Sequence, residues 1–316
     1  MPEPEQPEAA APGAPAAPDT GCGFVALIGA PNVGKSTLIN ALVGTKISIV
    51  TPKVQTTRTL IRGIACEGAA QLIFVDTPGI FAPRRRLDRA MVGTAWGSAQ
   101  DADVVALLVD ARKGLKEDDE AIIQRLSDVH TPAKVLVLNK VDVVAKTALL
   151  VLAQMLNERS TFVATFMISA LSGDGVDDLK KWLAAQVPPG PWLYPVDQIS
   201  DAPLRQLAAE ITREKLYLRL HQELPYQSTV ETEAWKELQD GSVRIEQTIY
   251  IERESQRKIV LGKGGRTIKA IGADARRELA AILEAPVHLF LFVKVREHWG
   301  DDPERYRGMG LEFPTE

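Results

Sequence analysis

The first chemical signal in the chain is the segment GAPNVGKS at residues 29–36. It matches the phosphate-binding pattern G-x-x-x-x-G-K-[ST] in full, between an apolar run and a helical pattern. Glycines let backbone N–H groups turn toward phosphate oxygens, and the positive end of the next helix adds to this field. We expect Lys35 to reach the β- and γ-phosphates and Ser36 to bind Mg²⁺. The predicted nucleotide contacts in this loop are Gly29, Ala30, Pro31, Asn32, Val33, Gly34, Lys35, Ser36 and Thr37.

A second motif, Asp76-Thr77-Pro78-Gly79, follows the apolar segment 71–75. A carboxylate there can hold Mg²⁺, and the N–H of Gly79 can contact a γ-phosphate. The next residue is Ile80, where a glutamine often orients the attacking water, and an apolar side chain cannot do so. We therefore predict slow hydrolysis, with Lys35, Asp76 and Gly79 as catalytic residues. Thr77, Pro78 and Ile80 are predicted to line the nucleotide; without the phosphate loop, this motif would indicate only a turn.

Two more motifs, Asn139-Lys140-Val141-Asp142 and Ser169-Ala170-Leu171, follow predicted strands at the same edge of the sheet. A carboxylate at Asp142 can accept both the N1–H and the exocyclic amino group of guanine, a pair of donors that adenine lacks. Asn139 would contact the other edge of the base and tie its loop to the phosphate loop. A backbone N–H of residues 169–171 could reach the guanine carbonyl, although Ser-Ala-Leu has little specificity by itself. The motifs indicate GTP rather than ATP.

Apolar segments of strand length alternate with helical patterns around these motifs. We predict strands at 24–28, 71–75, 104–109, 134–138 and 161–168, and helices at 35–43, 87–99, 117–129, 146–159 and 176–187. This alternation indicates βαβ units and a mostly parallel sheet, with ligands at the carboxyl ends of the strands. Pro188, Pro189 and Pro191 end the pattern. An α/β domain is therefore predicted at 23–188 and a linker at 189–202.

The rest of the chain predicts an α+β domain at 203–310, in the order α-β-β-α-α-β, and a short tail at 311–316. It contains a G-x-x-G loop, Gly262-Lys263-Gly264-Gly265, between two helical stretches. KH domains of the second type have this order and use such a loop to clamp about four nucleotides of RNA. Residues 253–277 hold eight basic and two acidic side chains, a local charge of +6. The predicted RNA contacts are Arg257, Lys258, Ile259, Gly262, Lys263, Gly264, Gly265, Arg266 and Lys269; a helix–helix turn with solvated charges is the alternative.

In this order, the four nucleotide motifs resemble those of the translation-factor-related GTPases over about residues 23–187. Together with the G-x-x-G loop and residues 284–289, which resemble the entry to the last strand of an Era KH domain, the resemblance extends over about 23–310 to the Era family. The family implies GTP, GDP and Mg²⁺ as cofactors, and binding of small-subunit ribosomal RNA near its 3′ end during subunit assembly. It also implies a hydrophobic residue at the position of Ile80 and loose association with the inner face of the membrane.

The segment Gln55-Thr56-Thr57-Arg58 resembles the first switch of the Era family, in which a threonine closes over Mg²⁺ and the γ-phosphate. Thr56 and Thr57 cannot be separated from the sequence; Thr57 is our first candidate, as a catalytic residue and as a metal ligand with Ser36 and Asp76. A solvated, threonine-rich loop is the alternative. In the second switch, Arg84, Arg85 and Arg86 could supply charge, although a solvated basic face is the simpler interpretation.

The amino-acid composition excludes several other classes of protein. There are 37 basic and 41 acidic residues, so the net charge is −4 and a uniformly basic nucleic-acid coat is excluded. Cys22 and Cys66 form no zinc or disulfide pattern, and no apolar run approaches the roughly 20 residues of a membrane span. We expect a cytoplasmic monomer with a disordered, proline- and alanine-rich tail at 1–22. Two rivals are a non-catalytic RNA-binding module and a P-loop ATPase or kinase; Asn139 and Asp142 argue against the latter.

Overall fold

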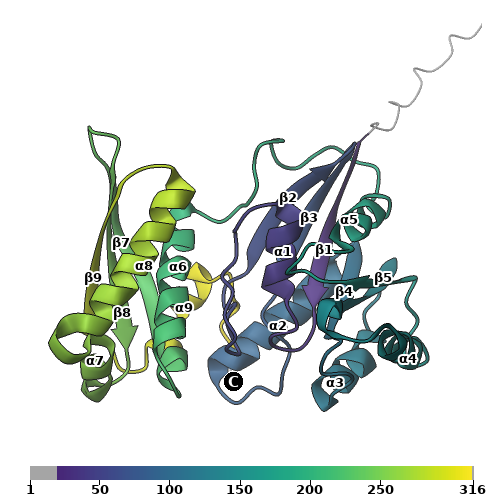
Figure 1. The fold of residues 1–316 in the computed structure, drawn as a ribbon, viewed down its shortest axis with the longest axis horizontal. Helices are drawn as coiled ribbons and strands as arrows, with labels where there is room; N and C mark the ends of the chain where they lie inside the picture. The colour runs from purple at the N-terminus through teal and green to yellow at the C-terminus, as the bar shows by residue number, and fades with distance from the viewer. Residues whose placement is uncertain (1–19, 315–316) are drawn as a thin grey trace, which may run out of the picture.

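The first domain is built on a six-stranded sheet with the strand order β2-β3-β1-β4-β5-β6 (Figure 1). The structure, a computed structural model, describes residues 20–314. The strands are β1 (Gly21–Ile28), β2 (Ile61–Glu67), β3 (Ala70–Asp76), β4 (Val104–Asp110), β5 (Ala133–Asn139) and β6 (Ala164–Ile168). β2 runs antiparallel to β3, whereas the other neighbouring strands are parallel. The predicted mostly parallel sheet is confirmed.

Helices cover both faces of this sheet. Helices α1 (Lys35–Val43) and α5 (Val176–Ala184) pack on one face. The other face is covered by α2 (Arg86–Asp101), α3 (Glu117–Leu126) and α4 (Lys146–Asn157). Strand β4, with the sequence VVALLVD, is buried along its whole length, as expected of a strand covered on both sides. Two apolar cores thus hold the strands whose carboxyl ends carry the nucleotide motifs.

The bounds of several elements of the first domain differ from the prediction, among them the ends of α3 and α5, which come three residues earlier than predicted. β1 begins at Gly21 because Gly21 and Cys22 pair with β3, so the predicted tail at 1–22 is wrong at its last two residues. Residues 1–19 of that tail lie outside the described residues. β2 has no counterpart in the prediction, because Arg62 and Gly63 interrupt its apolar residues and its hairpin partner β3 supplies the pairing. β6 is shorter than predicted and begins at Ala164.

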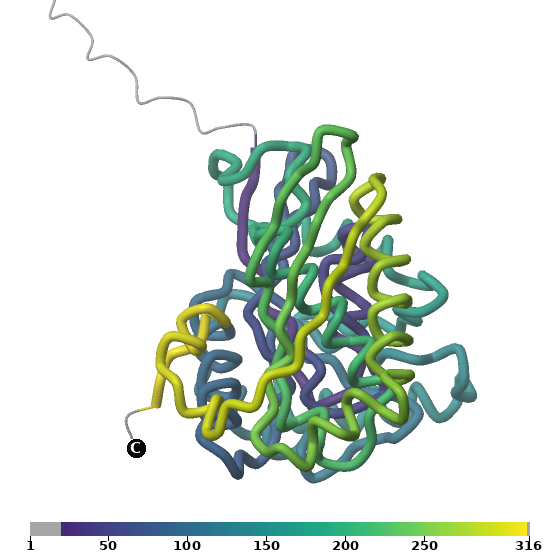
Figure 2. Tube along the Cα trace, turned by 90° about the vertical axis from the view of Figure 1, so that its left-hand side faces the viewer, coloured from purple at the N-terminus to yellow at the C-terminus, as the bar shows by residue number. Residues whose placement is uncertain are grey.

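The second domain follows the predicted order α-β-β-α-α-β. Its elements are α6 (Leu204–Arg219), β7 (Ser228–Glu237), β8 (Val243–Ile251), α7 (Glu254–Leu261), α8 (Arg266–Leu283) and β9 (Val287–Val295). The sheet has the order β7-β8-β9, with β7 antiparallel and β9 parallel to β8. Apolar residues of α6 and α8 pack against it, and Figure 2 shows α8 running alongside the three strands.

The chain beyond β9 returns to the first domain. After the short helix α9 (Pro303–Gly308), Leu311 packs with Tyr306 against Ala90 and Met91 of α2. Figure 2 shows this yellow segment beside the blue helix α2. Leu311 is only 4% exposed, so the segment predicted as a short tail at 311–316 packs on the first domain in its described part. The sequence pattern missed this because the apolar residues are few and their partner is remote in the chain.

The linker between the domains lies along the edge strand β2. The N–H of Ile64 donates to the carbonyl of Ile199 at 2.9 Å, and Ser200 forms a bridge with Gly63. Arg62 and Asp201 form an ion pair at 2.9 Å. The linker is therefore fixed to the first domain over its last residues. Within residues 20–314, no helix has the length and apolar character of a membrane span.

Candidate functional site

The loop between β1 and α1 is held in a tight curl by residues from another motif. Gly29, Asn32 and Gly34 have positive φ angles of 149°, 63° and 105°. A side chain is excluded at Gly34, because an added Cβ would lie 2.3 Å from Asn139 Nδ2. That amide also donates to the carbonyl of Val33 at 2.8 Å. The predicted tie between Asn139 and the phosphate loop is thus present in the fold.

Lys35 is buried at the start of α1. Its Nζ donates to the carbonyl oxygens of Gly29 and Ala30, both at 3.0 Å, and forms no ion pair within 4 Å among the described residues. Burial lowers the pKa of Lys35 to about 8, against the opposing charge of Asp76. A buried ammonium held only by neutral carbonyls gains strongly from a phosphate, because charge-assisted hydrogen bonds are about twice as strong as neutral ones.

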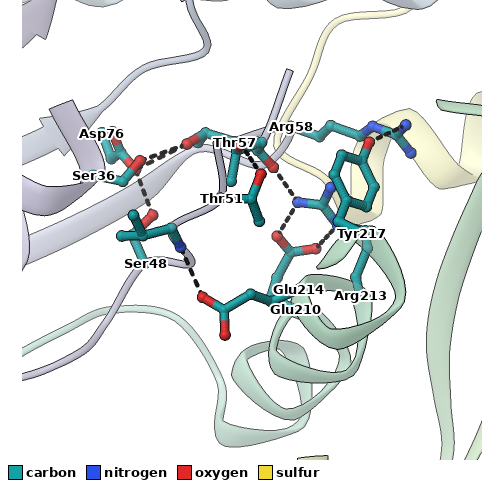
Figure 3. Close-up of polar contacts among 12 residues, drawn as sticks. Ser36, Ser48, Thr51, Thr57, Arg58, Asp76, Glu210, Arg213, Glu214 and Tyr217 are labelled. Atoms are coloured by element: carbon teal, nitrogen blue, oxygen red, sulfur yellow. Dashed lines mark hydrogen bonds and ion pairs between the residues drawn. The ribbon is translucent and has the colours of Figure 1, made fainter. Parts of the chain in front are cut away.

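Three hydroxyl groups converge on one carboxylate beside this lysine (Figure 3). Asp76 Oδ2 accepts from Ser48 Oγ at 2.6 Å, Ser36 Oγ at 3.0 Å and Thr57 Oγ1 at 3.3 Å. Ser36 Oγ and Thr57 Oγ1 are 2.8 Å apart. Thr56 lies elsewhere, with its Oγ1 at 2.7 Å from Thr51 Oγ1. The structure therefore brings Thr57, and not Thr56, to the carboxylate.

This group of oxygens fits Mg²⁺. Asp76 is fully buried, which raises its pKa, while the Ser48 hydroxyl and the charge of Lys35 oppose the shift. Its second oxygen, Oδ1, is buried without a hydrogen-bond partner. A hard divalent cation prefers carboxylate and hydroxyl oxygens and would give Oδ1 the partner that the protein lacks. In the described part of the chain, no cluster of three His, Cys, Asp or Glu side chains offers another metal site.

The residues after Asp76 are packed closely against the phosphate loop. Thr77 Oγ1 donates to the carbonyl of Leu27 at 2.6 Å. At Gly79, an added Cβ would lie 2.9 Å from Pro31 Cα, so only glycine allows this approach. The N–H of Ile80 donates to the carbonyl oxygen of Gly29 at 3.1 Å. Ile80 is only 6% exposed, and its side chain packs in the apolar core between the sheet and helices α2, α3 and α4. The side chain of Ile80 and its N–H group are therefore both engaged within the protein, and Ile80 lies outside the lining of the cavity beside the phosphate loop.

Asn139 also connects the two loops that carry the base motifs. Its Oδ1 accepts from the N–H groups of Lys140 at 2.8 Å and Ala170 at 3.0 Å. Lys140 Nζ contacts the carbonyl of Asn32 at 2.6 Å and Asp110 Oδ2 at 2.7 Å. Asp142 and Leu171 are exposed beside this network. Asp110, like Ser48, has no place in the prediction; its position at the end of β4, on the same sheet edge, is the signal that could have found it.

A cavity of about 370 Å³ joins the phosphate loop to the first switch. Its walls include Lys35, Ser36, Thr37, Thr57 and Gly79. Lys140 lines it too, together with Arg112 and Lys113, which the prediction omits. Asp142 and residues 169–171 lie outside its lining. The cavity thus brings Lys35 and Gly79 together with two of the three predicted metal residues, Ser36 and Thr57, while Asp76 lies outside its lining.

The G-x-x-G loop joins α7 to α8 on the second domain. Gly262, Gly264 and Gly265 have positive φ angles of 70°, 62° and 75°, and an added Cβ on Gly262 would lie 2.2 Å from Thr267 Oγ1. The side chains of Arg257, Lys258, Ile259, Lys263, Arg266 and Lys269 are exposed, whereas Gly262 and Gly265 are half-buried. The predicted basic surface therefore lies around the loop, at the N-terminus of an 18-residue helix.

Comparisons with known proteins agree with this arrangement. Residues 24–140 match a family model described as 50S ribosome-binding GTPase, and residues 223–300 match one described as KH domain. The GTPase Era of Afipia carboxidovorans is 72% identical over 297 residues, covering 94% of this chain and 96% of the relative. The GTPase Era of Brucella suis is 68% identical over 299 residues, covering 95% and 96%. The chain belongs to the Era family of GTPases.

Two solved Era structures share the fold with a TM-score of 0.87 and 39% identity, covering 92% of this chain and 99% of each. One is Era in complex with MgGDPNP and nucleotides 1506–1542 of 16S ribosomal RNA. The other is a tyrosine-to-alanine variant of Aquifex aeolicus Era bound to GDP·AlF4⁻. As an Era GTPase, the present chain hydrolyses GTP to GDP with its first domain and has a KH domain as its second.

Proposed function

We propose that this Era GTPase binds small-subunit ribosomal RNA near its 3′ end through its KH domain, in a manner governed by the bound nucleotide, and acts in assembly of the small subunit. The observation that carries the proposal is the exposed basic G-x-x-G loop, in a chain that aligns over 92% of its length with an Era holding 16S RNA. The family description for residues 24–140 mentions the 50S ribosome, but the RNA in that complex favours the small subunit.

For the nucleotide, we assign Ser36, Thr57 and Asp76 to Mg²⁺, which when bound neutralises charge on the β- and γ-phosphates. Lys35 exchanges the carbonyls of Gly29 and Ala30 for phosphate oxygens, and the N–H of Gly79 contacts the γ-phosphate. Because the side chain of Ile80 packs in the core, it cannot orient the attacking water. Slow intrinsic hydrolysis follows from this assignment.

For the base, we assign Asp142 to the N1–H and amino group of guanine. Within the described residues, the N–H groups of Ser169, Ala170 and Ser172 bond to the protein itself. This favours Leu171 as the backbone donor to the guanine carbonyl. Asn139 then acts mainly by holding the phosphate loop and the 169–171 loop together.

For RNA, we assign the backbone of the G-x-x-G loop and the start of α8 to phosphate groups, which favour the positive end of a helix. The exposed basic side chains add attraction, while Ile259 offers an apolar surface, 57% exposed, to an unstacked base. The assigned residues are Arg257, Lys258, Ile259, Gly262, Lys263, Gly264, Gly265, Arg266 and Lys269.

The test is binding of labelled oligonucleotides from the 3′ end of small-subunit ribosomal RNA, at one salt concentration. We expect tighter binding to protein loaded with a non-hydrolysable GTP analogue than to protein loaded with GDP. The relative that holds MgGDPNP and RNA together supports this direction. Equal affinity in both states would refute the switch, because a ligand shifts an equilibrium only through differential binding.

The cellular setting is also a proposal. We infer a cytoplasmic, monomeric protein with a fraction bound peripherally to the inner membrane, which rests on the family resemblance alone. Sedimentation of the purified chain tests the monomer. Flotation with anionic vesicles tests the membrane fraction, and absence of the protein from the floating fraction at low salt would refute it.

A further inference from the structure

The first switch segment contacts both the nucleotide site and the KH domain. Residues 44–60 contain no helix or strand, so contacts with other parts of the chain fix their conformation. Two hydroxyls of the segment, those of Ser48 and Thr57, point to Asp76 in the nucleotide site. The residues on both sides of each hydroxyl are held by the KH domain (Figure 3).

Glu214 of α6 brackets Ser48. Its Oε1 accepts from the N–H of Val50 at 2.8 Å, and both of its oxygens lie 2.8 Å from Lys46 Nζ, which also pairs with Glu278. Its side chain is 4% exposed, and Lys215 also contacts it at 2.6 Å. Because the two partners precede and follow Ser48 by two residues, this carboxylate helps to hold the chain through Ser48, together with Asn40 of α1, whose side chain bonds to the backbone of Ile47 and Ser48.

Arg213 and Arg58 bracket Thr57 in the same way. Arg213, which is 1% exposed, donates to the carbonyl of Thr56 and is held by Glu210 through its Nε at 2.8 Å. Burial alone would lower the pKa of Arg213, but the charge and hydrogen bonds of Glu210 outweigh it and raise the pKa, so the guanidinium stays charged. Arg58 extends into the KH domain and donates to Tyr217 Oη at 2.7 Å and Ser228 O at 2.8 Å.

We propose that Arg213 and Glu214, two adjacent residues of the KH domain, are positioning residues for the GTPase reaction. They act through the first switch by holding Thr57 and Ser48 at the carboxylate of Asp76, and they touch neither nucleotide nor metal ligand. The KH domain then helps to hold the nucleotide site in its conformation even when no RNA is bound. The inference rests on the assignment of Thr57 and Asp76 to Mg²⁺ proposed above.

The experiment compares full-length Arg213→Ala and Glu214→Ala with Arg219→Gln, which removes an ion pair with Asp274 inside the KH domain on the same helix. Single-turnover GTP hydrolysis is measured against Mg²⁺ concentration, without RNA. Loss of residues that orient metal ligands typically costs ~10–100-fold in metal affinity or activity. We expect the Mg²⁺ concentration at half-maximal rate to rise by about tenfold in both alanine variants.

If Arg213 and Glu214 only stabilised the fold, replacing them would also change measurements other than the Mg²⁺ response. GDP affinity without Mg²⁺ depends on the phosphate loop, so we expect it to stay within about twofold of the wild type in all three variants. Glu214→Gln keeps an acceptor for Val50 but loses the charge that pairs with Lys46, so its Mg²⁺ response should lie between Glu214→Ala and the wild type. If the alanine variants do not fold, Glu214→Gln and Arg213→Lys decide the question with the same measurements.

A Mg²⁺ response identical to that of Arg219→Gln would overturn the proposal. Thr57→Val tests the underlying assignment separately: if it leaves the Mg²⁺ response unchanged, Thr57 is no ligand, whatever the KH variants do. RNA binding enters none of these measurements, so failure of the RNA proposal is distinguishable from failure of this one.

Discussion

Both candidate sites would contact phosphate groups, but Lys35 in the phosphate loop is 6% exposed, whereas Lys263 and Arg266 in the KH loop face solvent. In the first site, side chains from four loops fix one another through hydrogen bonds before any ligand arrives. In the second, the glycines set the backbone conformation and the charged side chains are exposed, with only local contacts such as the pair Arg257–Glu254 and the hydrogen bond from Arg266 to the carbonyl of Lys263. A preorganised, buried site stabilises one ligand geometry strongly, whereas an exposed basic loop gives many weak contacts that salt screens.

The largest effect is expected from Lys35→Ala. Removing one preorganised electrostatic contact typically costs ~100–1000-fold in rate, so single-turnover GTP hydrolysis should fall by at least about 100-fold. Lys113→Ala is the matched control, because Lys113 lines the same cavity from an exposed position. A loss in rate of less than about tenfold would show that burial does not increase the contribution of Lys35 to catalysis.

Asp142→Asn should weaken GTP binding by about 100-fold, since each hydrogen bond to a charged group contributes ~1.5–3 kcal/mol. Xanthosine triphosphate should recover part of the loss, because the asparagine amide can donate to the oxygen that replaces the guanine amino group. Competition against labelled GDP measures both. Asp177→Asn, at an exposed position of α5, serves as the control. An equal loss of affinity for GTP and for xanthosine triphosphate would contradict the assignment of Asp142 to guanine.

A smaller effect is expected at the KH loop. Gly264 has a φ of 62°, which strains any side chain placed there, but the space around its absent Cβ is open, and asparagine and aspartate tolerate this backbone region better than most residues. Gly264→Asp should weaken RNA binding by about tenfold, because the aspartate repels the RNA phosphates. This loss of affinity should become smaller as the salt concentration rises. Gly264→Asn is the isosteric control. Similar losses in both variants would mean that the backbone, and not charge, dominates this contact.

The smallest effect concerns the chain that joins the two regions. Leu311→Ala removes a side chain from the cluster with Tyr306 and Met91 and should cost about 2 kcal/mol of unfolding free energy, the low end for buried leucines. Thermal unfolding of the GDP-bound protein measures this. Leu150→Ala, at a position 64% exposed, should leave the midpoint unchanged. An unchanged midpoint for Leu311→Ala would imply that the C-terminal segment contributes no stability.

The sequence was sufficient where residue type and local geometry determine each other. The glycines of the phosphate loop and the apolar run of β4 predict their conformations directly. The choice between Thr56 and Thr57 was not accessible, because it depends on contacts of the first switch with α6, more than 150 residues away. The same holds for Ser48 and for Leu311, whose partners are remote in the chain. β2 was missed for another reason: its partner β3 is a neighbour in the chain, but Arg62 and Gly63 interrupt the apolar pattern of the strand.

The linker along β2 has a consequence for self-association. β2 is an edge strand, and an uncovered edge offers N–H and carbonyl groups to any other extended chain. Here Ile199 and Ser200 occupy part of that edge. A flexible glycine-serine replacement of equal length would still connect the two domains, but it would leave β2 open to pairing between molecules. The native linker thus reduces the length of open strand edge that another molecule could pair with, as well as joining the two domains.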